Sequence, residues 1–184
     1  MFLKKILILS IFFFYACSKE SEDDNTGLIL ALVQTQNLNA ANASLNAERN
    51  SQFILNGSWN SFTGNATTGG SILTISAKQG ANGTILTDGT GFSSCAIINQ
   101  FDNNAGYYIA QNPENNGGCF SGDTNKGRYF KTIFFQDGSR YWTCTIFSAQ
   151  TSIAAAVAVV DNTTKTSPGT SGCGGFAWSR IERR

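Results

Sequence analysis

The chain has 184 residues, with 13 basic and 12 acidic side chains and no histidine. This balanced charge creates no field that would attract nucleic acid, so a nucleic-acid-binding protein is excluded. The lack of histidine removes the usual general base of serine and cysteine hydrolases, so triad hydrolases are excluded as well.

The N-terminus has the pattern of a bacterial lipoprotein signal. Lys4 and Lys5 precede an apolar run over residues 6–15, and Ala16 places a small residue before Cys17. Such a run is too short to span a membrane, which fits a signal that is cleaved. We therefore expect cleavage before Cys17, lipid on Cys17, and export by the Sec route to the outer membrane or cell surface, where the lipid is the anchor. The sequence leaves open which face of the membrane the protein occupies.

Removal of the signal peptide, residues 1–16, leaves 168 of the 184 residues, which suit one domain with one sizeable core. The 13 basic side chains fall to 11 against 12 acidic ones, a net charge of −1. We divide the mature chain into a lipidated tether, residues 17–52, and a single β domain, residues 53–184. Residues 18–26 are acidic and lack core-forming side chains, so we expect them to be flexible. A short helix is expected near residues 27–36, weakening further on because asparagine is a poor helix former.

From residue 53 the pattern changes to short aromatic and β-branched runs separated by Gly, Asn and Asp, which predicts an antiparallel β domain. The expected strands are residues 53–62, 71–77, 84–88, 92–100, 106–111, 128–136, 139–147 and 175–181. Asp137 and Gly138 suit the two-residue turn of a hairpin between two of these strands. Because side chains alternate along a strand, Trp142, Cys144 and Ile146 share one face, which we expect to point into the core.

One segment breaks the β pattern. Residues 153–160 are dominated by Ala and Val, follow several Ser and Thr residues, and contain no Gly or Pro. We interpret them as a short helix with a Ser or Thr cap that packs against the sheet before the last strand. The valines of this segment would also suit a strand.

Four cysteines remain besides Cys17, and an even number in an exported protein predicts two disulfides. Several pairings are possible, and we favour Cys95 with Cys119 and Cys144 with Cys173, because each pair joins neighbouring predicted elements. A metal site fits less well, since no Cys-x-x-Cys spacing occurs and no histidine supplements the thiolates. We therefore predict neither a metal nor a cofactor.

Carboxylate-pair catalysis, as in glycosidases, needs no histidine and stays open as a less favoured alternative. The carboxylates that could serve are Asp88, Asp102, Glu114, Asp123 and Asp137. Most lie beside Gly or Asn, where acidic residues favour solvated turns. We therefore predict that the protein is not an enzyme.

Two stretches resemble known families. The run Tyr141-Trp142-Thr143-Cys144, an Ala-rich stretch and the ending Gly172-Cys173-Gly174-Gly175-Phe176-Ala177-Trp178 are similar to a spirochaete lipoprotein family of leptospiral type. This resemblance covers residues 53–184 and implies a location and a fold rather than an activity. The run Gly57-Ser58-Trp59 resembles the Gly-x-Trp of lipocalins. We expect a mainly β fold, either an antiparallel sheet or a lipocalin-like small barrel of about eight strands, with one short helix before the last strand.

Two functions remain open for the β domain. Its Asn- and Gly-rich loops at residues 103–105, 113–118 and 121–127 favour a surface interaction protein with a protein partner at the cell surface. A lipocalin-like barrel would instead bind a small apolar ligand. The residues that could line its pocket are Phe53, Trp59, Phe101, Tyr107, Tyr129, Phe134 and Trp142. Core packing is the more frequent fate of such aromatic side chains.

Overall fold

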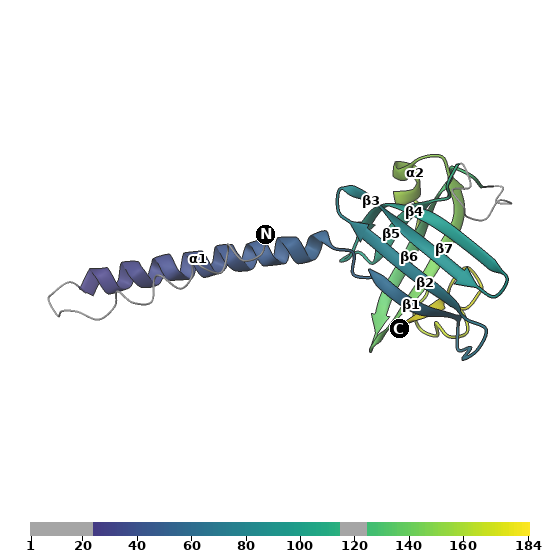
Figure 1. Cartoon of the computed structure of the whole chain (residues 1–184), viewed down its shortest axis with the longest axis horizontal. Coiled ribbons are helices and arrows are strands. Elements are labelled where there is room, and N and C mark those ends of the chain that lie inside the picture. The colour runs from purple at the N-terminus through teal and green to yellow at the C-terminus, as the bar shows by residue number, and fades with distance from the viewer. Residues whose placement is uncertain (1–23, 115–124) are drawn as a thin grey trace. The chain divides into compact units, whose positions relative to one another are not determined.

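The structure, a computed structural model, describes residues 24–114 and 125–184 (Figure 1). The chain divides into two compact units, Met1–Leu45 and Asn46–Arg184. The first contains most of helix α1 (Asp24–Ser51), and the second contains a β-barrel with the short helix α2 (Ile153–Val157).

Helix α1 is longer than the sequence predicts. It begins at Asp24 and continues to Ser51, so the expectations of a flexible segment up to residue 26 and of a helix that weakens after residue 36 are wrong where the structure describes the chain. No Gly or Pro follows Gly27 within α1, and its recurring Ala and Leu residues offset the few tenths of a kcal/mol by which each Asn disfavours a helix. Across the described helices, none combines the length and the hydropathy that a membrane span requires.

Eight antiparallel strands form a closed barrel in chain order, in which each strand pairs with the next and β8 pairs with β1. The strands are β1 (Gly57–Thr63), β2 (Ser71–Lys78), β3 (Ala81–Gly89), β4 (Phe92–Asp102), β5 (Tyr107–Gln111), β6 (Tyr129–Asp137), β7 (Arg140–Gln150) and β8 (Ser179–Arg183). Closure leaves no free sheet edge. The predicted mainly β fold is confirmed, and the structure selects the barrel over the open sheet.

Phe53 closes one end of the barrel. Its ring stacks on that of Phe101 with centroids 4.8 Å apart and packs edge-on against Tyr108 and Phe134 at 5.5 and 5.7 Å. The first strand was expected to include residues 53–56, but these form a turn, in which the Asn56 N–H donates to the Phe53 carbonyl at 3.0 Å. The strand therefore begins at Gly57.

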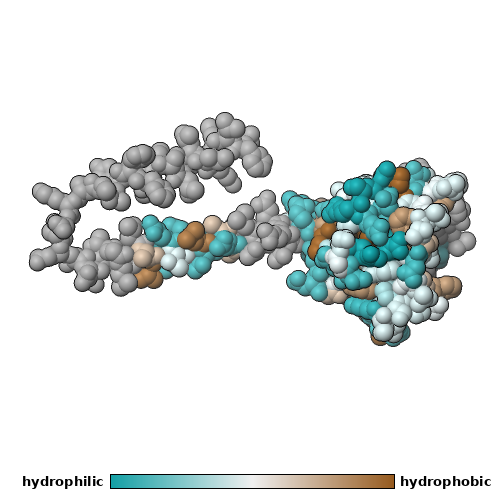
Figure 2. All heavy atoms as spheres, turned by 90° about the horizontal axis from the view of Figure 1, so that it is seen from below, coloured by the Kyte–Doolittle hydropathy of each residue, from teal (hydrophilic) through white to brown (hydrophobic). Residues whose placement is uncertain are grey.

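Alternate residues of the strands fill the barrel between this plug and its middle. The interior core consists of Phe53, Leu55, Trp59, Leu73, Ile75, Ala77, Ile85, Ile98, Phe101, Tyr108, Ala110, Phe134 and Ile181. On the face of the barrel unit that Figure 2 shows, hydrophilic and neutral residues predominate and hydrophobic ones are scattered. The apolar side chains are thus concentrated inside.

The outer face of β6 and β7 is buried as well. A second apolar cluster lies there, separate from the interior core, and consists of Ile133, Trp142, Cys144 and Trp178. Trp178 comes from the segment between α2 and β8, is fully buried, and packs edge-on against Phe135 with centroids 5.0 Å apart. Its Nε1 donates to the Thr164 carbonyl at 3.0 Å, which ties the C-terminal segment to this face.

The expectation that Trp142, Cys144 and Ile146 point into the barrel is therefore wrong. The inward positions of β7 are instead Tyr141, Thr143 and Thr145. Apolar side chains normally mark the one buried face of an antiparallel strand, but here the C-terminal segment covers the other face too. The larger apolar side chains consequently pack outward beneath that segment.

The hairpin between β6 and β7 differs from its prediction by one residue. Asp137 pairs with Arg140, so the two turn residues are Gly138 and Ser139 rather than Asp137 and Gly138. Gly138 has a φ of 61°, which favours glycine at the first turn position.

Helix α2 confirms the predicted short helix but ends at Val157, before residue 160. The Ser152 hydroxyl caps it by accepting a hydrogen bond from the Ala155 N–H at 3.1 Å. The helix packs against β5, β6 and β7 with Ala156 fully buried. It covers part of the barrel's outer surface, as the apolar composition predicts.

Candidate functional site

A cavity of about 910 Å³ occupies the end of the barrel away from the Phe53 plug. At this end β1, β3, β5 and β7 finish and β2, β4, β6 and β8 begin. The cavity reaches the surface there, because the exposed residues Thr63, Thr90 and Phe92 are part of its lining. Its volume falls within the range of small-molecule sites.

The inner part of the cavity is apolar. Leu73, Ile85 and Ala110 line it, and each keeps only 7–9% of its surface exposed. Ala96 and Phe130 complete this apolar wall. Small inward side chains at Ala96 and Ala110 leave space where larger ones would fill the barrel.

Toward the mouth the wall becomes polar. Among the described lining residues ten are serine or threonine: Ser61, Thr63, Ser71, Thr87, Thr90, Ser94, Thr132, Thr143, Thr145 and Ser179. On β3, Thr87 is the next inward position after Ile85, and on β4 Ser94 is the next after Ala96. The same two-residue step separates Ser71 from Leu73 on β2.

We call five of these residues the hydroxyl collar: Ser61, Ser71, Thr87, Ser94 and Ser179. Ser61 lies opposite Ser71, and Thr87 lies opposite Ser94, as cross-strand partners. Across the described part of the chain, no side-chain hydrogen bond joins the collar hydroxyls to one another or to other protein groups. They therefore keep their full hydrogen-bonding capacity.

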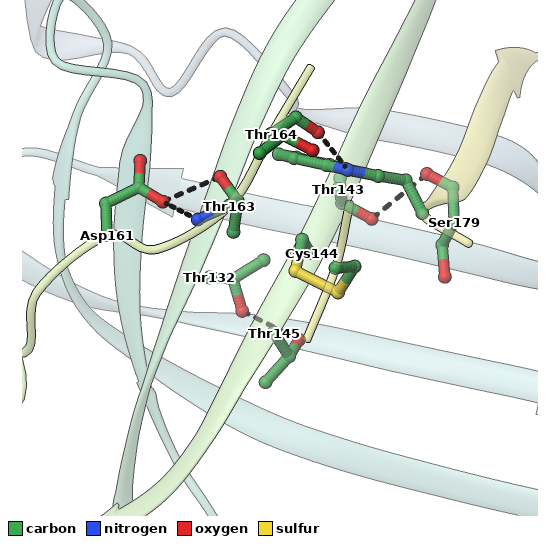
Figure 3. Close-up of a disulfide and its surroundings, with 10 residues drawn as sticks. Thr132, Thr143, Cys144, Thr145, Asp161, Thr163, Thr164 and Ser179 are labelled. Carbon is green, nitrogen blue, oxygen red and sulfur yellow. Dashed lines mark hydrogen bonds between the residues drawn. A yellow bond between two sulfur atoms is a disulfide. The ribbon is translucent and has the colours of Figure 1, made fainter. Parts of the chain in front are cut away.

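A second group of hydroxyls is already paired. Thr132 and Thr145, opposite each other on β6 and β7, share a hydrogen bond of 2.9 Å (Figure 3). The Thr143 hydroxyl donates to the Ser179 carbonyl at 3.5 Å. Burial raises the pKa of the Tyr108 hydroxyl above its ordinary value, and a hydrogen bond with Thr132 partly opposes this shift. Tyr108 is consequently neutral at physiological pH.

None of the described lining residues carries a charge. A charged ligand would have to lose its hydration without gaining an ionic partner from these residues, which is strongly unfavourable. The described residues also contain no group of three or more His, Cys, Asp or Glu side chains that could hold a metal ion.

The seven aromatic residues predicted to line a pocket lie elsewhere. Phe53, Trp59, Phe101 and Phe134 belong to the packed interior core. Trp142 belongs to the apolar cluster on the outer face of β6 and β7, Tyr107 packs against that cluster, and Tyr129 is absent from the described cavity lining. The prediction of these residues as pocket lining is therefore corrected: large rings fill the barrel, whereas the open end is lined mainly by small side chains. The sequence signal that could have revealed the site is a Ser or Thr two residues from an inward apolar residue, because both then lie on the same face of the strand.

The predicted disulfide between Cys144 and Cys173 is present, with the two Cα atoms 5.6 Å apart (Figure 3). It connects β7 to the segment that precedes β8. Cys95, which also lines the cavity, is disulfide-bonded as well. Its predicted partner Cys119 lies outside the described residues, as does the predicted lipidation site Cys17.

The loop at residues 103–105, expected to display polar groups, contributes to the fold. The Asn103 side chain accepts from the Ile54 N–H at 3.1 Å and donates to the Gln52 carbonyl at 2.8 Å. The Asp102 carboxylate accepts hydrogen bonds from the backbone N–H groups of Asn104 and Ala105 in this same loop, both at 2.9 Å. The loops at residues 113–118 and 121–127 lie partly outside the described residues.

The candidate catalytic carboxylates do not gather around the cavity. Asp88, Asp102, Glu114 and Asp137 are all absent from its described lining, and Asp123 lies outside the described residues. Asp88 instead accepts a hydrogen bond from Ser93 at 3.3 Å.

The arrangement can enclose one small uncharged molecule, with apolar contact at its inner end and hydrogen-bonding groups near its mouth. No protein-family model, no curated protein and no solved structure matches the chain.

Proposed function

We propose that the barrel is a small-molecule binding module. The observation that carries this proposal is the cavity of about 910 Å³ at the open end of a closed barrel, with an apolar inner wall and an exposed mouth. Burial of ligand apolar surface against this wall would contribute about 25 cal/mol per Å². A lipocalin-like binder is thus preferred to a surface interaction protein, since the described loop at residues 103–105 is engaged in internal hydrogen bonds.

Dye binding tests the proposal. The suitable material is the mature chain with Cys17→Ser, which cannot be acylated and so adds no lipid phase. Prodan, an uncharged naphthalene dye with one carbonyl group, should bind one molecule per chain with a blue-shifted emission. Ala96→Trp, which places a large ring in the cavity, should abolish the shift.

Thr84→Trp is the matched control, because Thr84 is exposed on the outer face of β3. This variant should bind the dye as the parent does. Absence of dye binding by the parent chain, or equal binding by the Ala96→Trp variant, would refute a ligand site in the barrel.

We also propose that the protein is anchored to the outer membrane or cell surface by lipid on Cys17. The support is the sequence: two lysines, a short apolar run and a small residue before the cysteine. Palmitate should label the protein, and globomycin should block its processing. If palmitate does not label the protein and globomycin does not block its processing, the proposed lipid anchor on Cys17 is refuted. The proposed ligand site does not depend on this result.

A further inference from the structure

We infer that the ligand is an uncharged amphiphile whose polar groups are hydroxyls or carbonyls, rather than a purely apolar molecule or a fatty acid. This inference rests on the proposed function and concerns the same cavity. It follows from three features of the wall: a hydroxyl collar with no hydrogen-bond partner among the described side chains, the lack of charge in the described lining, and the apolar inner part.

The hydroxyl collar disfavours a purely apolar ligand. Cross-strand partners such as Thr87 and Ser94 face the cavity, and their hydroxyls form no hydrogen bond with any other described residue. An apolar ligand that displaced solvent from them would leave these hydroxyls desolvated and unpaired, which is unfavourable for each group. A ligand with hydroxyl or carbonyl groups at the same level would satisfy them.

The absence of charge in the described wall disfavours a carboxylate or an ammonium group. Ser, Thr and Tyr hydroxyls offer hydrogen bonds but no counter-charge, so a charged head group would be poorly compensated inside the barrel. Uncharged head groups avoid this penalty.

The apolar wall determines which way the ligand points. Leu73 and Ile85 lie deeper in the barrel than their strand neighbours Ser71 and Thr87. The apolar part of the ligand therefore lies inward and its polar part lies at the collar, near the mouth.

Competition among ligands with the same chain and different head groups tests the inference. The probes are 1-decanoylglycerol, decanoate and decyltrimethylammonium, each used to displace prodan from the mature chain with Cys17→Ser. Decanoylglycerol should displace the dye at a concentration at least about tenfold lower than either charged probe. Displacement by decanoate at an equal or lower concentration would overturn the inference while leaving the ligand site intact.

Variants of the collar provide the second arm. The double variant Thr87→Val with Ser94→Ala removes two hydroxyls and little volume. It should weaken the binding of decanoylglycerol at least about fivefold without strengthening the binding of the charged probes. The matched control is Thr74→Val on the outer face of β2, where the side chain is exposed. Unchanged decanoylglycerol affinity in the double variant, with its folding confirmed by an unaltered melting temperature, would overturn the inference. If no probe and no dye binds the parent chain, the proposed function itself fails.

Discussion

The guanidinium of Arg183 lies 4.0 Å from the centre of the Trp59 ring. The two residues are cross-strand partners on β8 and β1, the last and first strands, so their contact lies at the seam where the barrel closes. Arg183 also donates from Nη1 to the Asn56 carbonyl at 2.8 Å, and Trp59 donates from Nε1 to the Leu55 carbonyl at 2.8 Å. The pair thereby connects the last strand, β8, and the first strand, β1, to the turn that precedes β1.

Arg183→Ala should lower the free energy of unfolding by about 1–2 kcal/mol, because it removes a cation–π contact and a charged hydrogen bond. Urea denaturation measures the loss. Arg140→Ala is the control, since Arg140 is exposed at the start of β7. Equal stability of the two variants would show that the seam contact contributes nothing.

Removal of the Cys144–Cys173 disulfide should destabilise the barrel unit. The two cysteines are 29 residues apart, and on the loop-entropy model closure of such a loop contributes about 3–4 kcal/mol. Cys144→Ala with Cys173→Ala should therefore shift the urea midpoint downward. Hydrogen exchange should also speed up in residues 158–178, the segment that the disulfide joins to β7, more than in β2 and β3. A uniform increase in exchange would contradict this local role.

Lys131→Met should destabilise the packing of α2 on the barrel. The Lys131 ammonium is buried and donates to the carbonyls of Val157 and Val159 at 2.9 and 2.8 Å, at the end of the helix. Methionine retains the apolar stem but leaves both carbonyls unpaired, so a loss of about 1–3 kcal/mol is expected in denaturant unfolding. Lys78→Met, at an exposed position of β2, should change stability little by comparison. A loss of similar size in both variants would show that the two hydrogen bonds of Lys131 do not stabilise the packing of α2.

Tyr108 should make the protein sensitive to alkali. Burial raises the pKa of its hydroxyl in the folded state above the ordinary value of about 10. Below about pH 10 the group is protonated in both states and adds no pH dependence. Above that pH the unfolded chain loses its proton first, so stability falls, by up to about 1.4 kcal/mol per pH unit, until the folded pKa is passed.

Tyr108→Phe should reduce this alkaline decline. Urea denaturation at a series of pH values measures it, and between about pH 7 and 9 the two proteins should show the same pH dependence. A decline of equal steepness in the variant above about pH 10 would contradict the assignment to Tyr108.

The approximate positions of the strands and of the short helix could be predicted from the sequence because both depend on local patterns, although the last strand begins at Ser179 and not at residue 175. The Ser152 cap precedes an Ala-rich run and marks the start of the helix. Gly138, which has a positive φ, indicates the hairpin, but the turn residues are Gly138 and Ser139 rather than Asp137 and Gly138. The length of α1 was underestimated because the small penalties of single Asn residues do not end a helix that contains no Gly or Pro after Gly27.

The site could not be predicted in the same way. Which face of β7 points inward depends on what covers the other face, and Trp178, from the segment between α2 and β8, supplies that cover. Large aromatic residues such as Phe53 and Phe101 attract attention as pocket lining, but their size lets them fill space. The cavity exists where residues such as Ala96 and Ser94 leave space unfilled.

A crystal structure of the mature chain soaked with prodan would show whether the open end of the barrel holds a ligand. We predict dye density inside the barrel against Ile85 and Phe130, with the dye carbonyl within hydrogen-bonding distance of the collar. Side chains that fill this space, or dye bound only on the outer surface, would show that the barrel has no ligand site.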